Sequence, residues 1–195
     1  PRRQELCVSG LTQGGENNIN EKIYLTKFIN CAAIETHSCL GEILKKNTGA
    51  NDQLKGGIIP EGFKRQMYKG GIIPEGFKRQ MYYTFGDFRD IFFGTDISSC
   101  KYIKGTSSAI KSKLGDINKK IRKGGKHIED YKKRQEWWET NGPHIWEAML
   151  CALTNGLTVA KEKNQIKTAY SYDELITNGT ASLEEFAKRP QFFRW

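Results

Sequence analysis

Hydrophobic residues recur at helical spacing through the middle of this chain, over residues 106–153. In the first part of this stretch the apolar positions follow one another at steps of three, four and seven, which places them in one stripe along a helix. The stripe consists of Ile110, Leu114, Ile117, Ile121, Ile128 and Tyr131. It predicts one long amphipathic helix, over residues 106–134, with polar faces that stay in water.

Beyond this helix the pattern predicts a buried region. Trp137 and Trp138 are followed by Asn141-Gly142, which favours a turn. Pro143 then suits the first position of a new helix, because its missing N–H is not needed there. The inner side of that second helix is apolar: Ile145, Trp146, Met149, Leu150 and Leu153. We therefore expect three tryptophans to anchor the core.

Segments on both sides of this stretch also predict helices. An Asn18–Glu21 capping box, with Asn20 as a competing cap, begins a helix that runs to about Lys46. A second capping box, Ser182–Glu185, begins a short helix. The segment 83–97 has one apolar inner face: Phe85, Phe88, Ile91 and Phe92. Residues 154–172 are polar and ambiguous. The predicted fold class is all-α.

The bulk properties allow a sizeable core and no membrane span. With 195 residues, the chain can form one domain or somewhat more. Its mean hydropathy is −0.63, and no apolar run approaches the ~20 residues of a transmembrane helix. Because the sequence begins inside a motif, we expect it to be part of a larger protein, so the absence of a signal peptide says nothing about location.

Positive charge is concentrated in one segment. Residues 101–134 hold twelve Lys and Arg against three Asp and Glu, a net charge of +9, whereas the rest of the chain holds nineteen of each sign. Such a segment attracts polyanions: nucleic acid, anionic lipid or a sulfated glycan. The alternative is a solvated helix face that has no ligand.

Residues 55–68 (KGGIIPEGFKRQMY) recur without change as residues 69–82. Natural repeats diverge, so the identical copy suggests one loop recorded twice, with a tandem duplication as the alternative. Each copy carries a net charge of +2, so the basic segment dominates in either case. The glycine-rich start lacks the Gly-Lys-Ser/Thr ending of a phosphate-binding loop, which makes it a weak nucleotide site. Its backbone N–H groups and Lys-Arg pair can still contribute to an anion site.

No constellation of residues indicates catalysis or metal binding. Glu35 lies among apolar neighbours, and Asp87 and Asp90 are three residues apart, but no nucleophile or metal ligand accompanies them. We expect Glu35 to pair with an arginine, and the two aspartates with Arg89 or another arginine. The histidines lack ligand spacing, and there is no C-x-x-C motif. The sequence therefore predicts no enzyme activity, no zinc site and no cofactor.

The five cysteines are widely spaced: Cys7, Cys31, Cys39, Cys100 and Cys151. Scattered cysteines among aromatic residues suggest disulfides in an exported protein, and the odd number suggests that one partner lies outside this chain. The alternative is that they are ordinary buried thiols.

Six motifs occur in an order that resembles one known family. They are Pro1–Cys7 (PRRQELC), Ala32–Glu35 (AAIE), Tyr83–Asp90 (YTFGDFRD), Gly94–Ile97 (GTDI), Trp137-Trp138 with Ile145–Leu153 (IWEAMLCAL), and Pro190–Trp195 (PQFFRW). This order is typical of Duffy-binding-like domains. These are the adhesion modules of malaria-parasite surface proteins displayed on infected red cells, and of related invasion ligands.

The resemblance implies a mostly helical, disulfide-linked fold in three subdomains. Residues 1–17 would end the first, residues 18–155 would form the second as a helical bundle, and residues 156–195 would begin the third. Cys39 and Cys100 are additional to the cysteines usual in the family. The hypothetical bridges are Cys39–Cys100 and Cys7–Cys151. Such domains are not enzymes. They bind host receptors, which are proteins or sulfated glycosaminoglycans.

Within such a family the basic segment favours a glycan ligand. Asn118–Lys123 resembles the clustered basic pattern of glycosaminoglycan-binding segments. The chain also looks similar to a domain of the placental type, which adheres to chondroitin sulfate A. The predicted glycan contacts are Lys55, Lys64, Arg65, Lys69, Lys78, Arg79, Lys119, Lys120, Arg122, Lys123 and Lys126.

The alternative hypothesis is a domain that binds a protein receptor or packs on neighbouring domains, with the basic helix only solvated. Nucleic-acid binding fits the charge but fits neither the cysteines nor the family motifs. The expected location is the extracellular face of the infected erythrocyte membrane, as part of a larger membrane protein and without direct membrane insertion by this segment.

Overall fold

The computed structural model describes residues 6, 8–12, 21–45, 71–95, 101–119, 127–155, 157, 159–177 and 182–194, with the backbone alone at 40–45, 101–102, 113–119 and 127–130. These residues form helices and no strand, as the sequence predicts. The helices are α1 (Ser9–Thr12), α2 (Glu21–Lys45), α5 (Glu75–Phe93), α6 (Lys101–Lys119), α7 (His127–Thr154), α8 (Ala160–Ala169), α9 (Tyr172–Thr177), α10 (Leu183–Lys188) and the 3-10 helix η3 (Gln191–Arg194).

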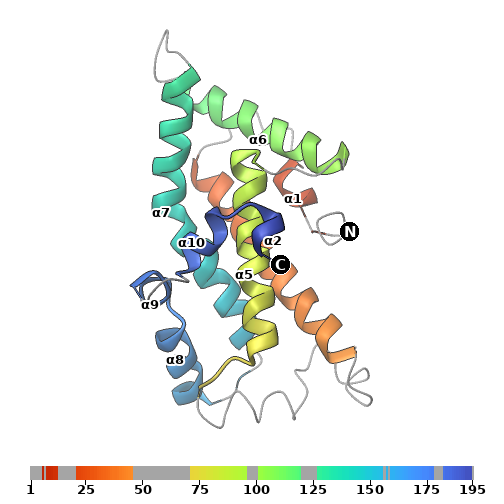
Figure 1. The fold of residues 1–195 in the computed structure, drawn as a ribbon, viewed down its shortest axis with the longest axis vertical. Coiled ribbons are helices and arrows are strands. Elements are labelled where there is room, and N and C mark those ends of the chain that lie inside the picture. The colour runs from red at the N-terminus through yellow and green to blue at the C-terminus, as the bar shows by residue number, and fades with distance from the viewer. Residues whose placement is uncertain are drawn as a thin grey trace.

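Three long helices make the centre of the molecule (Figure 1). α2 and α7 pack extensively on each other, and α5 packs against both. α6 crosses one end of this group, where it contacts α1 and α5, and α10 lies across α5. α8 and α9 lie toward the opposite end from α6. The basic segment therefore supplies α6 and the beginning of α7 at one end of the molecule.

An aromatic core joins the three central helices. Phe92 of α5 stacks on Trp137 of α7, with ring centroids 4.7 Å apart and planes at 21°. Phe28 of α2 contacts both rings at 5.7 Å. Farther along α5, Phe85 meets Trp146 edge to face at 5.8 Å. Such pairs contribute about 0.5–1.5 kcal/mol each beyond the area they bury. The predicted tryptophan core and the inner face of segment 83–97 are confirmed.

The start points of two helices follow from local sequence. α2 begins at Glu21, directly after the competing cap Asn20, whereas the Asn18–Glu21 capping box would begin the helix at residue 19. Residues 18–20 lie outside the described residues, so both caps stay predictions. α10 begins after Ser182, whose hydroxyl accepts a hydrogen bond from the Glu185 N–H at 3.2 Å. Because this bond satisfies one of the unpaired donors of the first turn, the second capping box is confirmed.

The single long helix predicted over residues 106–134 is wrong. α6 ends at Lys119 and α7 begins at His127, and the two helices run in different directions (Figure 1). The sequence between them contains Gly124-Gly125. Each glycine disfavours a helix by roughly 1 kcal/mol relative to alanine. The spacing of apolar residues did not take this cost into account, so it did not predict the break between the two helices.

The predicted turn at Asn141-Gly142 and the new helix at Pro143 are also wrong. α7 runs without interruption through these residues, with Pro143 inside it. A buried stripe continues across the site: Trp138, Gly142, Ile145 and Met149. At Gly142 a side chain would meet the Trp138 indole at 3.2 Å, so the glycine makes room for the tryptophan. Burial of this stripe outweighs the cost of about 3 kcal/mol for an internal proline.

The loop expected for the repeat is wrong for its downstream copy, which is helical from Glu75 onward and enters the core. Residues 71–82 form the approach to α5 and its first turns, and they bury Ile73, Phe77 and Met81. The upstream copy, residues 55–68, lies outside the described residues, so the origin of the repeat stays open. The subdomain boundaries after residues 17 and 155 also stay predictions.

Candidate functional site

The basic residues predicted to contact a glycan are only partly within the described structure. Lys78 and Arg79 lie on the first turns of α5, where Lys78 pairs with Glu75 at 2.8 Å and Arg79 is exposed. Lys119 is the last residue of α6, and its side chain is not described. The others lie outside the described residues: Lys55, Lys64, Arg65, Lys69, Lys120, Arg122, Lys123 and Lys126.

The fold separates these residues into two regions. The end of α6 and the beginning of α7 meet at the end of the molecule where α5 also ends (Figure 1). Lys78 and Arg79 lie at the other end of α5, about 24 Å away along the helix at 1.5 Å per residue. One short ligand segment therefore cannot contact both regions.

Two cations of the basic segment lie against the C-terminal end of α5. This helix has no basic residue in its own last turn and ends at Gly94, whose φ is +69°. The ammonium group of Lys111 lies so close to Gly94 that a side chain at this position would overlap it. Arg134 donates a hydrogen bond from Nη1 to the Phe93 carbonyl at 3.3 Å. Cations near a helix C-terminus are stabilising, so both residues have a structural role that the sequence did not indicate.

The remaining charges at this end leave only a small described cationic surface. Lys104 and Lys132 are exposed, whereas Lys133 and Arg134 are half-buried. Farther along α7 the exposed face becomes acidic at Glu136, Glu139 and Glu147. The excess of positive over negative charge in residues 101–134 therefore does not extend along the rest of α7.

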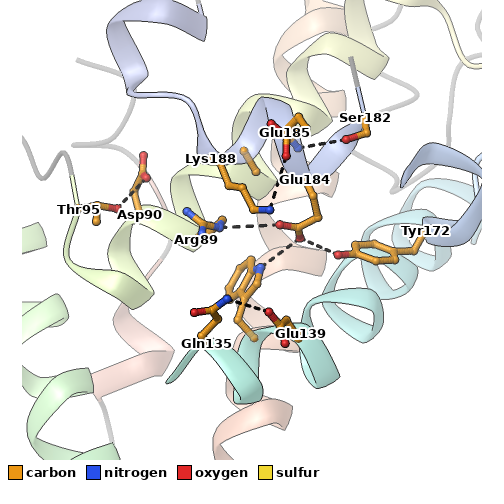
Figure 2. A network of polar contacts seen from close by, with 12 residues as sticks. Arg89, Asp90, Thr95, Gln135, Glu139, Tyr172, Ser182, Glu184, Glu185 and Lys188 are labelled. Atoms are coloured by element: carbon orange, nitrogen blue, oxygen red, sulfur yellow. Dashed lines mark hydrogen bonds and ion pairs between the residues drawn. The ribbon is translucent and has the colours of Figure 1, made fainter. Parts of the chain in front are cut away.

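A carboxylate on α10 joins four helices (Figure 2). Glu184 Oε1 accepts a hydrogen bond from the Tyr172 hydroxyl of α9 at 2.6 Å and from the Trp138 indole of α7 at 3.2 Å. Its other oxygen lies 3.9 Å from Nε of Arg89 on α5. Burial and the hydrogen bond to Glu184 raise the pKa of Tyr172. This network fastens the C-terminal helices to the bundle.

A buried arginine holds the last described residues. Arg194 Nη1 lies 2.9 Å from Asp90 Oδ2 and 3.7 Å from Asp87 Oδ1. Its Nη2 donates to the Ala187 carbonyl at 2.6 Å, and a side chain at Gly86 would lie 2.9 Å from Nη1. The prediction that the two aspartates pair with Arg89 or another arginine is therefore confirmed, and the partner is Arg194.

Beside this anchor, two aromatic side chains project into solvent. Phe192 and Phe193 are 83% and 68% exposed, and their rings contact each other at 5.5 Å. The Phe193 N–H donates to the Pro190 carbonyl at 2.9 Å. Because the buried Arg194 side chain anchors the 3-10 helix η3, the two phenylalanine rings project from a backbone whose position is fixed.

The cysteines within the described residues do not confirm a disulfide-linked fold. Cys31, Cys39 and Cys151 are not joined to one another. Cys39 instead accepts a hydrogen bond from Gln80 at 3.5 Å and lies 3.6 Å from Oε1 of Glu35. Glu35 is buried, at 8% exposure, and its expected pairing with an arginine stays a prediction. Cys7 and Cys100 lie outside the described residues, so the two bridges that involve them stay predictions.

Neither a metal centre nor a membrane span is found in the described part of the chain. There, no group of three His, Cys, Asp or Glu side chains has a metal-binding arrangement. None of the described helices has the length and apolar character needed to cross a membrane.

These features define a helical domain with a cationic end, an exposed aromatic pair and buried carboxylates that serve the fold. The chain matches the Duffy binding domain family over residues 1–193. Because this match covers nearly the whole chain, the chain belongs to the Duffy binding domain family. No curated protein and no solved structure matches it.

Family membership establishes the class of function. Duffy-binding-like domains are non-enzymatic adhesion modules of malaria-parasite surface adhesins, and they bind host receptors. Asp87, Asp90 and Glu184 are all engaged in contacts between helices.

Proposed function

We propose that this domain binds a sulfated glycosaminoglycan, chondroitin sulfate A, through the basic segment at the α6–α7 end. It would act at the extracellular face of the infected erythrocyte membrane, as part of a larger membrane protein. The observation that carries the proposal is the net charge of +9 within residues 101–134, while the rest of the chain is neutral. This segment forms α6 and the beginning of α7, which lie at the same end of the molecule.

The chemistry of a sulfated glycan fits such a segment. A guanidinium group can bind a sulfate or carboxylate through two hydrogen bonds, whereas an ammonium group acts as a mobile point charge. Each exposed contact contributes little, so affinity depends on many contacts and falls steeply with salt. Lys111 and Arg134 support α5, so the proposed contacts are Lys119, Lys120, Arg122, Lys123 and Lys126. The exposed Lys104 and Lys132 add to the positive charge of the same segment.

The second candidate ligand is a protein receptor or a neighbouring domain. Phe192 and Phe193 favour it, because exposed aromatic side chains on a held backbone are typical anchors of protein interfaces. Under this alternative the basic segment is only solvated.

A pair of charge variants tests the glycan proposal. The first variant replaces Lys119, Lys120, Arg122 and Lys123 with glutamine. The control replaces four exposed or half-exposed cations elsewhere with glutamine: Lys22, Lys163, Lys188 and Arg189. Both lower the net charge by four. We expect the first variant to lose binding to immobilised chondroitin 4-sulfate at about 0.15 M salt, and the control to retain most of it.

Circular dichroism and thermal melting establish that both variants are folded. Equal loss in both would show that total charge, and not the α6–α7 end, governs binding. Retention in both would contradict the proposed site and favour the protein receptor.

A further inference from the structure

The chain carries two identical copies of the segment that begins α5. Residues 71–82, in the downstream copy, lead into α5 and form its first turns, at the end of the molecule beside α8 (Figure 1). Residues 57–68, in the upstream copy, have the same amino acids in the same order. Every side chain through which the downstream copy packs on the rest of the fold therefore occurs a second time in the chain.

Three apolar side chains anchor the downstream copy in the core: Ile73, Phe77 and Met81, each no more than 2% exposed. The position of Gly71 is equally specific. Its φ is +64°, and a side chain there would meet Cβ of Gln165 on α8 at 3.1 Å, so this position favours glycine. The upstream copy supplies the same four residue types at the same spacing: Gly57, Ile59, Phe63 and Met67.

Two further contacts join the downstream copy to α2 and α7. Gln80 donates a hydrogen bond from Nε2 to Sγ of Cys39 on α2 at 3.5 Å. The ring of Tyr82 meets Trp146 of α7 edge to face, with ring centroids 5.6 Å apart. The upstream copy has the same residue types at Gln66 and Tyr68. The surface on which the segment packs therefore cannot distinguish the two copies by their side chains.

The junction after each copy does distinguish them. Tyr82 continues directly into the rest of α5, with helical hydrogen bonds across the junction. Tyr68 is followed after one residue by Gly70-Gly71, which disfavours a helix. With the upstream copy in place, the bonds across the junction would be interrupted, and residues 69–82 would form a loop there. Because the entropy of loop closure changes slowly with length, the interrupted helix is the main cost.

We propose that the upstream copy is an alternative first segment of α5, and that residues 57–68 can replace residues 71–82 on the same surface of α2, α7 and α8. The arrangement with the downstream copy is the major state, because its helix is unbroken. The exchanged arrangement is a minor state that becomes dominant when a substitution damages the downstream copy. The cations at the start of the helix are the same in both states, because Lys64-Arg65 replaces Lys78-Arg79.

A thiol-specific cross-link to Cys39 reports which copy is in place. Gln80→Cys puts a thiol near Cys39 in the major state, and Gln66→Cys does so in the exchanged state. When the full chain is treated with a short bismaleimide, we expect a high yield of cross-link from Gln80→Cys and a low yield from Gln66→Cys, each identified by peptide mass. Addition of Phe77→Asp buries a charge in the downstream copy, so it should raise the Gln66→Cys yield to about that of Gln80→Cys.

Phe63→Asp is the matched control, because it is the same substitution at the same place in the upstream copy. It should abolish the cross-link from Gln66→Cys and leave the cross-link from Gln80→Cys unchanged. A Gln66→Cys cross-link that survives Phe63→Asp would come from chance encounters of an undocked segment, and it would refute the exchange.

Urea unfolding followed by tryptophan fluorescence gives a second readout that needs no cross-link. Phe63→Asp alone should leave the urea midpoint unchanged, Phe77→Asp should lower it but keep a cooperative transition, and the double variant should lose the transition. Equal behaviour of Phe77→Asp and the double variant would contradict the proposal, since the upstream copy would then give no protection. Loss of stability from Phe63→Asp alone would also contradict it, because both copies would then be needed at the same time.

Discussion

Arg194 stabilises the fold by joining the short 3-10 helix η3 to α5 through buried ion pairs. Its side chain is buried against Asp87 and Asp90, and the Tyr83 hydroxyl donates to its backbone carbonyl. Removal of the guanidinium would leave two buried carboxylates without their cation. Breaking a buried ion pair in this way is costly, although replacing the entire group by apolar residues is not.

We predict that Arg194→Met lowers the free energy of unfolding by roughly 3–5 kcal/mol. Arg189→Met is the control, because Arg189 is exposed, and it should change stability by less than about 0.5 kcal/mol. Urea unfolding followed by tryptophan fluorescence measures both. An Arg194→Met protein as stable as the control would refute the anchoring role.

Tyr24 gives a pH-dependent prediction. It is fully buried in α2, its hydroxyl has no hydrogen-bond partner within the described structure, and burial raises the pKa of Tyr24 above its ordinary value near 10. The folded state therefore keeps the phenol proton at pH values where the unfolded chain releases it. This group leaves stability unchanged below about pH 10 and lowers it as the pH rises further.

We expect Tyr24→Phe to be at least as stable as the wild type at pH 7, because it removes a buried hydroxyl without a partner. Between pH 10 and pH 11 the wild type should lose about 1 kcal/mol more stability than the variant. Urea midpoints at the two pH values give the difference. Parallel loss in both proteins would show that the Tyr24 phenol is not kept protonated by the fold.

At the level of elements, α7 holds together in spite of Pro143. A proline lacks the N–H that would bond the carbonyl four residues earlier, which here belongs to Glu139. Asn141 makes an additional bond nearby, from Nδ2 to the Trp137 carbonyl at 2.8 Å. Tertiary burial of the tryptophan stripe overrides the local signals at this point, and sequence spacing alone could not weigh that burial.

We predict that Pro143→Ala stabilises the protein by about 1–3 kcal/mol, because it restores one helical hydrogen bond. Pro74→Ala is the control: Pro74 directly precedes α5, so alanine adds no bond within the helix. Thermal melting compares the two. Destabilisation by Pro143→Ala would mean that the proline ring is required for packing.

α5 depends on cations from its neighbours at its C-terminal end. Lys111 and Lys104 lie seven residues apart on the exposed face of α6, but Lys111 also reaches Gly94. We expect Lys111→Ala to cost about 0.3–1 kcal/mol of stability and Lys104→Ala to cost nothing measurable. Urea denaturation at low salt measures the difference. If both substitutions changed stability equally, Lys111 would have no special role in stabilising the C-terminal end of α5.

Over the whole molecule, periodicity and capping signals were sufficient to predict α2, α10, the part of α5 from Tyr83 onward and the buried tryptophans. They did not predict the first turns of α5, which lie in the repeat that was expected to be a loop. The predicted features are local, because each helix carries its own apolar face or cap. The cationic end was also predictable as a segment, since charge density is a property of the sequence. The break between α6 and α7 could have been predicted only if the helix-disfavouring Gly124-Gly125 pair had been considered together with the apolar spacing.

The partners of individual side chains could not be read in this way. Arg194 with Asp90, Arg134 with Phe93 and Gln165 with Gly71 are brought together by the packing of elements that are distant in sequence.

The measurement that tests the account most directly is binding of the domain to immobilised chondroitin 4-sulfate at about 0.15 M salt, with heparin and desulfated chondroitin alongside. If chondroitin sulfate A is the ligand, the domain should prefer chondroitin 4-sulfate to the more highly charged heparin, because attraction by charge alone would favour heparin. Equal or stronger binding to heparin would reduce the α6–α7 end to a non-selective cationic surface. Binding to none of them would contradict a glycan receptor and direct attention to a protein partner at Phe192 and Phe193.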